Sequence, residues 1–359
     1  MTHLTPPTDP YVVVVNDVGV ARHHGSKMVT ARLIDELSHR GLQVVTIPAG
    51  ENWRDHTTWI DGARAVVVNG EGTLHHSAPA AKELLAIAPY AQSRALPAFL
   101  VNSIWQDNSS MMAQQAKAFT AVFVRESRSQ KQLADAQVAA TVVPDLVLGW
   151  SAPAGQAVAR KGAIVTDSVV LADTLRLAKS AHATGAVFTT LEPPHPEPLD
   201  YTDASFIRLR RERKKDISYW RKRVVSQAYR ARGAAYSQGR RWRGWQVEFS
   251  LDDFFTALRH SELLITGRFH AVCMAMVTGT PFLAPSSNSH KIDAMLEDAG
   301  LANRVINSSV VREAVLMPPG WTDTESGAVA RYVEQAVQAQ QHMFDTIAHQ
   351  ALSEGNYTQ

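Results

Sequence analysis

Short apolar runs that each end in a polar turn recur along the first 150 residues. They read YVVVVN (11–16), QVVTI (43–47), ARAVVVNGEG (63–72), PAFLVNSI (97–104) and AVFVRES (121–127). A strand that is apolar on both faces must be covered on both faces, as in a parallel sheet. Helical patterns separate the runs, and the first one has Ser26 as its expected N-cap. Strand–helix alternation at this spacing predicts a doubly wound α/β layer.

The same alternation starts again after residue 162. The strands expected there are GAIVTD (162–167), AVFTTL (186–191), ELLITG (262–267) and TPFLAPS (280–286). The turn-rich stretch 151–162 separates the two series, and 359 residues suffice for two domains. We therefore predict two Rossmann-like domains, residues 1–150 and 151–359, that face each other across a cleft. Ligands of open α/β folds bind beyond the carboxyl ends of the strands, so the cleft is the expected site.

The last long segment, residues 326–355, has the apolar spacing of one amphipathic helix, which we expect to pack back across the domain interface.

Composition excludes several other classes of protein. The single cysteine, Cys273, leaves no intramolecular disulfide framework and is expected in the core. The segment MTHLTPPTDP (1–10) lacks the apolar run of a signal peptide, and no stretch reaches the roughly 20 apolar residues of a membrane-spanning helix. A cytoplasmic location is therefore expected.

The sequence GRFHA places Arg268 and His270 directly after a strand, at the start of a helix. Such a helix start favours an anion, a guanidinium matches phosphate or carboxylate, and an imidazole can donate a proton near neutral pH. The loop after the next strand adds Ser286, Ser287, Asn288, Ser289 and Lys291. Together these residues predict an anion pocket. The simpler alternative is helix capping by Ser289 with solvated charges.

Gly70 and Gly72 directly follow a buried strand, with Glu71 between them. Glycines at this position permit a tight turn and close approach of the backbone to a ligand, and Glu71 is expected to project into the cleft. A dinucleotide-binding fingerprint needs a third glycine where this chain has His75, so dinucleotide binding is disfavoured. A tight turn without ligand contact is an equal alternative.

Two histidine pairs lie in loops after strands. His23 and His24 follow the first strand, which ends near Asn16, and His75 and His76 follow the glycine turn. Four histidines across two loops would make a conceivable zinc site, but no nearby carboxylate or cysteine completes a ligand set. We predict no metal ion and interpret these loops as polar linings of the cleft.

Basic and aromatic residues crowd residues 206–245, which contain over a third of all Lys and Arg. This composition suits an anionic membrane surface, a polyanionic glycan or nucleic acid, and the alternative is an insertion with merely solvated arginines. Nucleic acid is disfavoured because no binding module is recognisable. Peripheral attachment to the inner face of the plasma membrane is the preferred hypothesis.

Four short motifs resemble, in order and spacing, those of the polysaccharide pyruvyl transferase family over roughly residues 11–300. They are VVVNGEGTL (66–74), VFVRESRS (122–129), VVPDLVLG (142–149) and ITGRFHAVCMAMVTGTPFLAP (265–285) with a downstream lysine. The resemblance implies a fold like that of GT-B glycosyltransferases. It also implies transfer of a pyruvyl group from phosphoenolpyruvate to a pair of sugar hydroxyls, forming a ketal, in the biosynthesis of bacterial surface polysaccharides.

Carried over to this chain, Arg268 and His270 match the family's donor-binding arginine and histidine. The expected donor site adds Ser286, Ser287, Asn288 and Lys291, and family members use a further arginine, which here falls in the basic segment. The first domain is expected to bind a sugar or lipid-linked glycan acceptor through Asn16, His23, His24, Gly70, Gly72 and His75. The loop HHGSKMV (23–29) departs from the family's usual N-x-G-D type.

The chemistry of phosphoenolpyruvate fits these residue types. Protonation of its methylene carbon develops oxocarbenium character, after which sugar hydroxyls add and phosphate departs. His270 is the expected general acid and Glu71 the expected base, with no metal or cofactor beyond the co-substrate.

Two alternatives stay open. One is a glycosyltransferase of the same shape that uses a nucleotide-activated sugar, such as an acidic sugar on a CMP carrier. The other is a non-catalytic glycan- or membrane-binding protein, in which Arg268→Ala and His270→Ala would leave binding intact.

Overall fold

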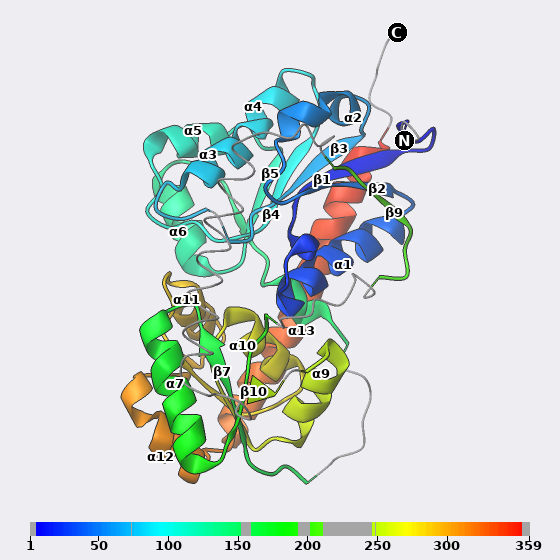
Figure 1. Ribbon diagram of the computed structural model, residues 1–359. Helices are drawn as coiled ribbons and strands as arrows, with labels where there is room; N and C mark the ends of the chain where they lie inside the picture. Colours follow the sequence, from blue (N-terminus) through cyan, green and yellow to red (C-terminus); the bar gives the residue numbers. More distant parts are fainter. Residues whose placement is uncertain are drawn as a thin grey trace, which may run out of the picture.

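The computed structural model describes residues 5–72, 74–151, 159–192, 202–210, 246–247 and 249–353. These residues form two α/β domains stacked end to end, the first mainly blue and cyan and the second mainly green to orange (Figure 1). Each domain is built around one parallel sheet, so the predicted α/β class with two doubly wound layers is confirmed.

The first sheet has the strand order β6-β5-β4-β3-β1-β2-β9, with all neighbours parallel. Its strands from the first half of the chain are β1 (Tyr11–Asp17), β2 (Gln43–Pro48), β3 (Ala65–Asn69), β4 (Ala98–Ser103), β5 (Ala121–Val124) and β6 (Thr141–Val142). Its helices are α1 (His24–Ser38), α2 (Thr57–Asp61), α3 (Pro79–Leu85), α4 (Ile87–Gln92), α5 (Ser110–Ala116) and α6 (Ser127–Asp135). All of β3 and β4 is buried, as continuous apolar runs require.

Two helices of this domain differ from the sequence expectation. The spacing of APAAKELLAIAPYAQ (78–92) predicts one helix, but α3 and α4 are separate because Pro89 has no N–H to donate to the Leu85 carbonyl. Ser26 does not cap α1. His23 does, and its Nδ1 accepts a hydrogen bond from the Ser26 N–H at 3.3 Å. The earlier helix start leaves the Ser26 hydroxyl available for another partner.

The second sheet has the order β10-β8-β7-β11-β12-β13, again all parallel. Its strands are β7 (Ala163–Ser168), β8 (Val187–Thr189), β10 (Gln246–Val247), β11 (Leu263–Gly267), β12 (Phe282–Pro285) and β13 (Val305–Ile306). Its helices are α7 (Leu171–Thr184), α9 (Leu251–His260), α10 (Phe269–Val277), α11 (Lys291–Asp298) and α12 (Val311–Leu316). Cys273 is fully buried in α10, as predicted.

One strand crosses from the second half of the chain to the first sheet. β9 (Phe206–Arg208) pairs with β2, and the following Leu209 is buried in the core of the first domain. The sequence prediction assigned everything after residue 150 to the second domain and began the basic insertion at 206, so it did not foresee this strand. Arg208 Nε donates to the buried Asp17 carboxylate at 2.7 Å, which anchors the strand. Residues 211–245 of the basic segment lie outside the described residues.

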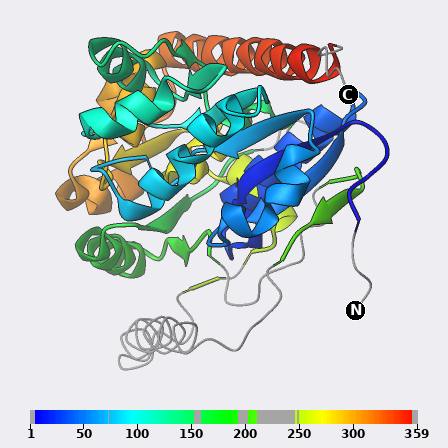
Figure 2. The same ribbon diagram turned by 90° about the horizontal axis from the view of Figure 1, so that it is seen from above.

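The last helix, α13 (Asp323–Leu352), runs along both domains (Figure 1). It begins with a capping box between Thr322 and Glu325. Figure 2 shows α13 in red along one edge of the molecule and α7 in green at the opposite edge. The buried face of α13 packs with residues of both domains in one apolar cluster. Within the described part of the chain, no helix has the length and apolarity needed to span a lipid bilayer.

Candidate active site between the two domains

In each sheet, the strands that follow the first strand of the domain are added on both of its sides, so the chain order runs in opposite directions from that strand. In the first sheet β2 and β3 flank β1, and in the second β8 and β11 flank β7. Such a reversal marks the place beyond the strands' carboxyl ends where open α/β folds bind ligands. Glu71 follows β3 and His270 follows β11, and the two side chains approach each other from opposite domains.

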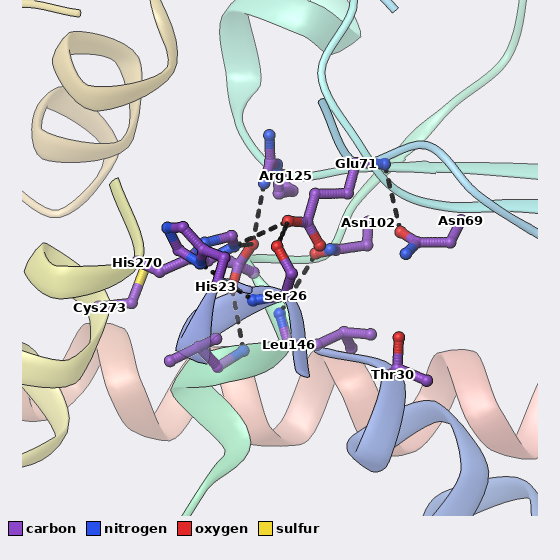
Figure 3. A network of polar contacts seen from close by, with 12 residues as sticks. His23, Ser26, Thr30, Asn69, Glu71, Asn102, Arg125, Leu146, His270 and Cys273 are labelled. Atoms are coloured by element: carbon purple, nitrogen blue, oxygen red, sulfur yellow. Dashed lines mark hydrogen bonds and ion pairs between the residues drawn. The ribbon is translucent and has the colours of Figure 1, made fainter. Parts of the chain in front are cut away.

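His270 lies in the first turn of α10 and is 7% exposed. Its Nε2 atom is 3.7 Å from Glu71 Oε1 (Figure 3). The same atom is 3.6 Å from Asp145 Oδ2. Both distances are too long for direct hydrogen bonds, and within the described structure Nε2 has no hydrogen-bond partner. Buried polar atoms are normally satisfied, so an unbonded imidazole nitrogen between two carboxylates indicates a functional position.

Asp145 supplies a fixed negative charge beside His270. Its carboxylate accepts hydrogen bonds from Arg125 Nη1 at 3.0 Å and from the Val147 N–H at 3.0 Å. Burial alone would raise the pKa of Asp145, but the neighbouring His270 and Arg125 and the Val147 amide together bring that pKa well below its usual range. Asp145 is therefore ionised at neutral pH.

Glu71 is oriented by the other side of the site. Ser26 Oγ donates to Glu71 Oε1 at 2.7 Å, and the Glu71 N–H donates to Asn69 Oδ1 at 3.2 Å (Figure 3). The Asn16 side chain donates to the Asn69 carbonyl at 2.7 Å, so Asn16 supports the turn that carries Glu71. Glu71 Oε2 and the nearby Asn102 Nδ2 are buried without partners among the described residues.

His23 and Gly25 form the wall next to His270. The His23 and His270 rings are in edge-to-face contact with centroids 5.2 Å apart. Burial, and then the charges of His270, Arg268 and other cations, lower the pKa of His23 well below 6.5, so its imidazole is neutral at pH 7. A Cβ on Gly25 would lie 2.3 Å from His270 Cβ, so only glycine permits this approach of α1 to α10.

Arg268 is paired with acids of its own domain. Its guanidinium contacts Asp167 and also donates to Glu192 Oε1 at 2.8 Å. Burial opposes the charge on Arg268, but these two carboxylates raise its pKa. The two partners differ in exposure, because the Asp167 side chain is 14% exposed and that of Glu192 is 51% exposed.

The loop after β12 is mostly turned to solvent. Ser286 Oγ donates to Asp293 Oδ1 at 2.7 Å, and Ser287 Oγ donates to Asn288 Oδ1 at 3.2 Å. Both hydrogen bonds lie at the solvent-exposed surface. Ser289 does not cap α11; its buried hydroxyl has no partner within the described structure.

Lys291, the first residue of α11, is different from the rest of that loop. It makes no hydrogen bond or ion pair with any described residue, and it lies near Arg125, Glu71, Arg268 and Asp145. Burial, reinforced by the charge of Arg125, lowers the pKa of Lys291 to about 8, while Glu71 opposes the shift. Lys291 is therefore a largely protonated amine at neutral pH beside the cluster, and no described residue serves as its fixed counter-ion.

Two residues of the site had no role in the sequence prediction. Arg125 is 3% exposed at the end of β5; besides its bond to Asp145, its guanidinium lies 4.6 Å from the ring centroid of Phe269. Asp145 precedes a short turn after β6. The signal for both was in the motifs RESRS and VVPD, where a charged residue follows a buried run, as Arg268 does after β11.

The remaining predicted residues have structural roles or lie farther out. The His24 N–H donates to the Leu191 carbonyl at 3.0 Å, which joins α1 to the second domain. A Cβ on Gly70 would meet Ser103 Cβ at 2.5 Å, and Gly72 has φ +78°, so packing and turn geometry account for these two glycines. His75 contacts His76, with 3.0 Å between their Nδ1 atoms. Among the described residues, no three His, Cys, Asp or Glu side chains are grouped to bind a metal ion.

Comparison with known families agrees with this architecture. The polysaccharide pyruvyl transferase family matches the chain over residues 28–289. The chain belongs to this family. The matched range contains Glu71, Asp145 and His270. The protein is thus a transferase of polysaccharide biosynthesis. No curated protein sequence matches it.

Several solved structures are similar to this transferase over nearly its whole length. A putative UDP-N-acetylglucosamine 2-epimerase from Listeria monocytogenes has a TM-score of 0.57 at 10% identity, covering 97% of this chain and 98% of the other. The glycotransferase of kitacinnamycin has a TM-score of 0.52 at 10% identity, covering 96% and 100%. Spinosyn rhamnosyltransferase SpnG has a TM-score of 0.52 at 11% identity, covering 94% and 100%. At these identities the likeness establishes the fold, which is of the GT-B type.

Proposed function

We propose that this enzyme transfers a pyruvyl group from phosphoenolpyruvate to two hydroxyls of a sugar and forms a cyclic ketal. The observation that carries the proposal is the buried, unbonded Nε2 of His270 between Glu71 and Asp145. Family membership supports the reaction class.

The charges around this cluster suit a donor with a phosphate and a carboxylate. Lys291 has no fixed counter-ion in the described structure, so its ammonium is the proposed partner of one anionic group. Arg268 is the proposed partner of the other. An exposed ion pair is weak, so the donor can replace Glu192 while Asp167 continues to orient the guanidinium. Ser286, Ser287 and Asn288 remain proposed contacts at the rim.

Two residues, a proton donor and a proton acceptor, suffice for the proton transfers of the proposed reaction. His270 gives a proton to the methylene carbon of phosphoenolpyruvate, and positive charge develops at the neighbouring carbon. A sugar hydroxyl adds there and loses its proton to Glu71, which passes it back to the neighbouring His270, 3.7 Å away, to restore both residues. The C–O bond to phosphate then breaks, and the second hydroxyl adds to close the ketal while its proton leaves with the phosphate. The ionised Asp145 stabilises the protonated imidazole before the transfer.

The acceptor and the location of the enzyme are further proposals. We infer that a sugar or lipid-linked glycan binds on the first-domain side, near Asn16, His23 and His75. Attachment of the basic segment 206–245 to anionic membrane at the cytoplasmic face stays a prediction. Liposome flotation tests it, since binding without preference for anionic vesicles contradicts it.

Ligand-induced stabilisation tests the donor. We expect phosphoenolpyruvate at 100 times its dissociation constant to add about 2.7 kcal/mol to the free energy of unfolding of the wild-type protein. CMP-, UDP- and GDP-linked sugars serve as the comparison panel. Stabilisation by a nucleotide sugar and none by phosphoenolpyruvate would replace this proposal with a nucleotide-sugar glycosyltransferase.

A further inference from the structure

The two domains are also joined by a buried contact beside the active site. Glu126, directly after Arg125, accepts a hydrogen bond from His290 Nε2 at 3.1 Å, and His290 directly precedes Lys291. Glu126 is fully buried and the His290 side chain is 10% exposed. The pair therefore connects the backbone of Arg125 in the first domain to that of Lys291 in the second.

The local hydrogen bonds fix both members of this pair. Glu126 is the N-cap of α6, and its Oε2 accepts from the Ser129 N–H at 2.9 Å. Ser129 Oγ contacts the Glu126 carboxylate and in turn accepts from the Trp105 N–H at 2.6 Å. The His290 N–H donates to Gln106 Oε1 at 3.0 Å. Each side is thus attached to the loop that follows β4.

Electrostatics makes the carboxylate necessary. α6 begins at residue 127 and α11 at residue 291, so the positive ends of two helix dipoles meet at this point. Burial alone would raise the pKa of Glu126, but bonds from His290 and Ser129 lower it. An ionised Glu126 compensates both helix ends and binds His290 to the first domain.

A second pair in the same contact region provides a natural comparison. Arg128 donates to Glu297 at 2.9 Å, and these side chains are 42% and 46% exposed. It joins α6 to α11 as the buried pair does, but it is at the surface and is not adjacent in sequence to a residue of the cluster. Exposed ion pairs contribute little to the stability of a folded protein, so this pair is a suitable control for the buried one.

We propose that Glu126 and His290 are positioning residues that hold Lys291, the proposed partner of one anionic group of the donor, at a fixed distance from Arg125, which orients Asp145. The inference rests on the proposed function, since it takes phosphoenolpyruvate as that donor. Neither residue is assigned contact with the donor. Their action is to fix the two backbone segments that carry Arg125 and Lys291.

Steady-state kinetics of the full-length enzyme tests the inference. We expect His290→Ala to raise the KM for phosphoenolpyruvate about tenfold or more, with the acceptor KM within about twofold. His290→Gln, which can place a donor nitrogen near the position of Nε2, should recover most of the loss. Arg128→Ala is the control and should stay within about twofold of wild type in every constant.

A double-mutant cycle separates positioning from general weakening. If His290 acts through Lys291, His290→Ala should have little further effect on the KM for phosphoenolpyruvate in a Lys291→Ala background. Additive effects would overturn the inference, as would an unchanged KM in His290→Ala. If His290→Ala does not fold, Glu126→Asp takes its place, because it keeps the charge but shortens the reach to His290.

Hydrogen exchange keeps the test independent of the proposed function. If wild type does not bind phosphoenolpyruvate, the donor assignment fails. The positioning still predicts that His290→Ala increases amide exchange in 125–129 and 289–293 together, whereas Arg128→Ala leaves both unchanged. Unchanged exchange in His290→Ala would show that the pair does not position these segments.

Discussion

At the scale of residues, the environment of each charge decides what it can do. His270 Nε2 has two carboxylates near it and a bond to neither, whereas Arg268 has two carboxylates and is bonded to both. Lys291 has no bonded partner in the described structure. The sequence placed Arg268 and His270 after a strand and Lys291 at a helix start, but it carried no information on pairing, because Asp167 approaches Arg268 from β7 and Glu192 from the segment after β8.

Removing the exposed partner of Arg268 should strengthen donor binding. In Glu192→Gln no carboxylate competes with the donor for that side of the guanidinium, so we expect the KM for phosphoenolpyruvate to fall about threefold or more. Glu83→Gln removes the exposed partner of another arginine, Arg54, and is the matched control. A higher KM in Glu192→Gln would show that Arg268 does not exchange this contact for the donor.

The pKa of Lys291 gives a pH dependence with a definite sign. Burial lowers this pKa to about 8, so the amine is charged below that pH and neutral above it. We expect the affinity for phosphoenolpyruvate, measured by calorimetry, to fall as the pH rises through about 8. Lys291→Arg stays charged and should not show this fall. The same fall in Lys291→Arg would assign the titration to another group.

At the scale of elements, the strands were predictable and the helix starts only in part. Continuous apolar runs predicted β1 to β5 because burial on both faces requires them. The cap of α1 was not predictable, because a histidine took the role expected of Ser26, whose hydroxyl instead bonds to Glu71. β9 was missed for another reason, since the pairing of residues 206–208 with β2 is set by tertiary packing.

The close approach of α1 to α10 makes Gly25 a sensitive position. Gly25→Ala would place a methyl group against the His270 side chain and displace the imidazole. We expect kcat to fall about a hundredfold while the far-ultraviolet circular dichroism stays native. Gly327→Ala, in α13 away from the site, is the control and should be neutral or slightly stabilising. Near-normal kcat in Gly25→Ala would argue that His270 is not the proton donor.

At the scale of the whole molecule, the site exists only where the domains meet. Asp145 and Glu71 come from the first domain and His270 from the second, and α13 packs against both. The sequence predicted two layers and ligand binding at strand ends. It could not predict which side chains meet, since that depends on how one layer sits against the other.

Gln340 connects α13 to the active site. This fully buried side chain donates to the Asp145 carbonyl at 2.9 Å and the Pro144 carbonyl at 3.3 Å. Gln340→Ala leaves both carbonyls without these bonds. We therefore expect the free energy of unfolding, measured by urea denaturation, to fall by about 1–3 kcal/mol. Activity should fall as Asp145 shifts. Gln338→Ala, on the exposed face of the same helix, should change neither quantity.

The central claim is that the cluster around His270 moves a pyruvyl group, and label transfer tests it most directly. Phosphoenolpyruvate labelled in its pyruvyl carbons is incubated with enzyme and a panel of nucleotide- and lipid-linked sugars. We expect label to enter a sugar with release of an equal amount of phosphate, and both signals to disappear in His270→Ala. Label transfer that persists in a folded His270→Ala enzyme, or release of phosphate with free pyruvate as the sole product across the panel, would contradict the account.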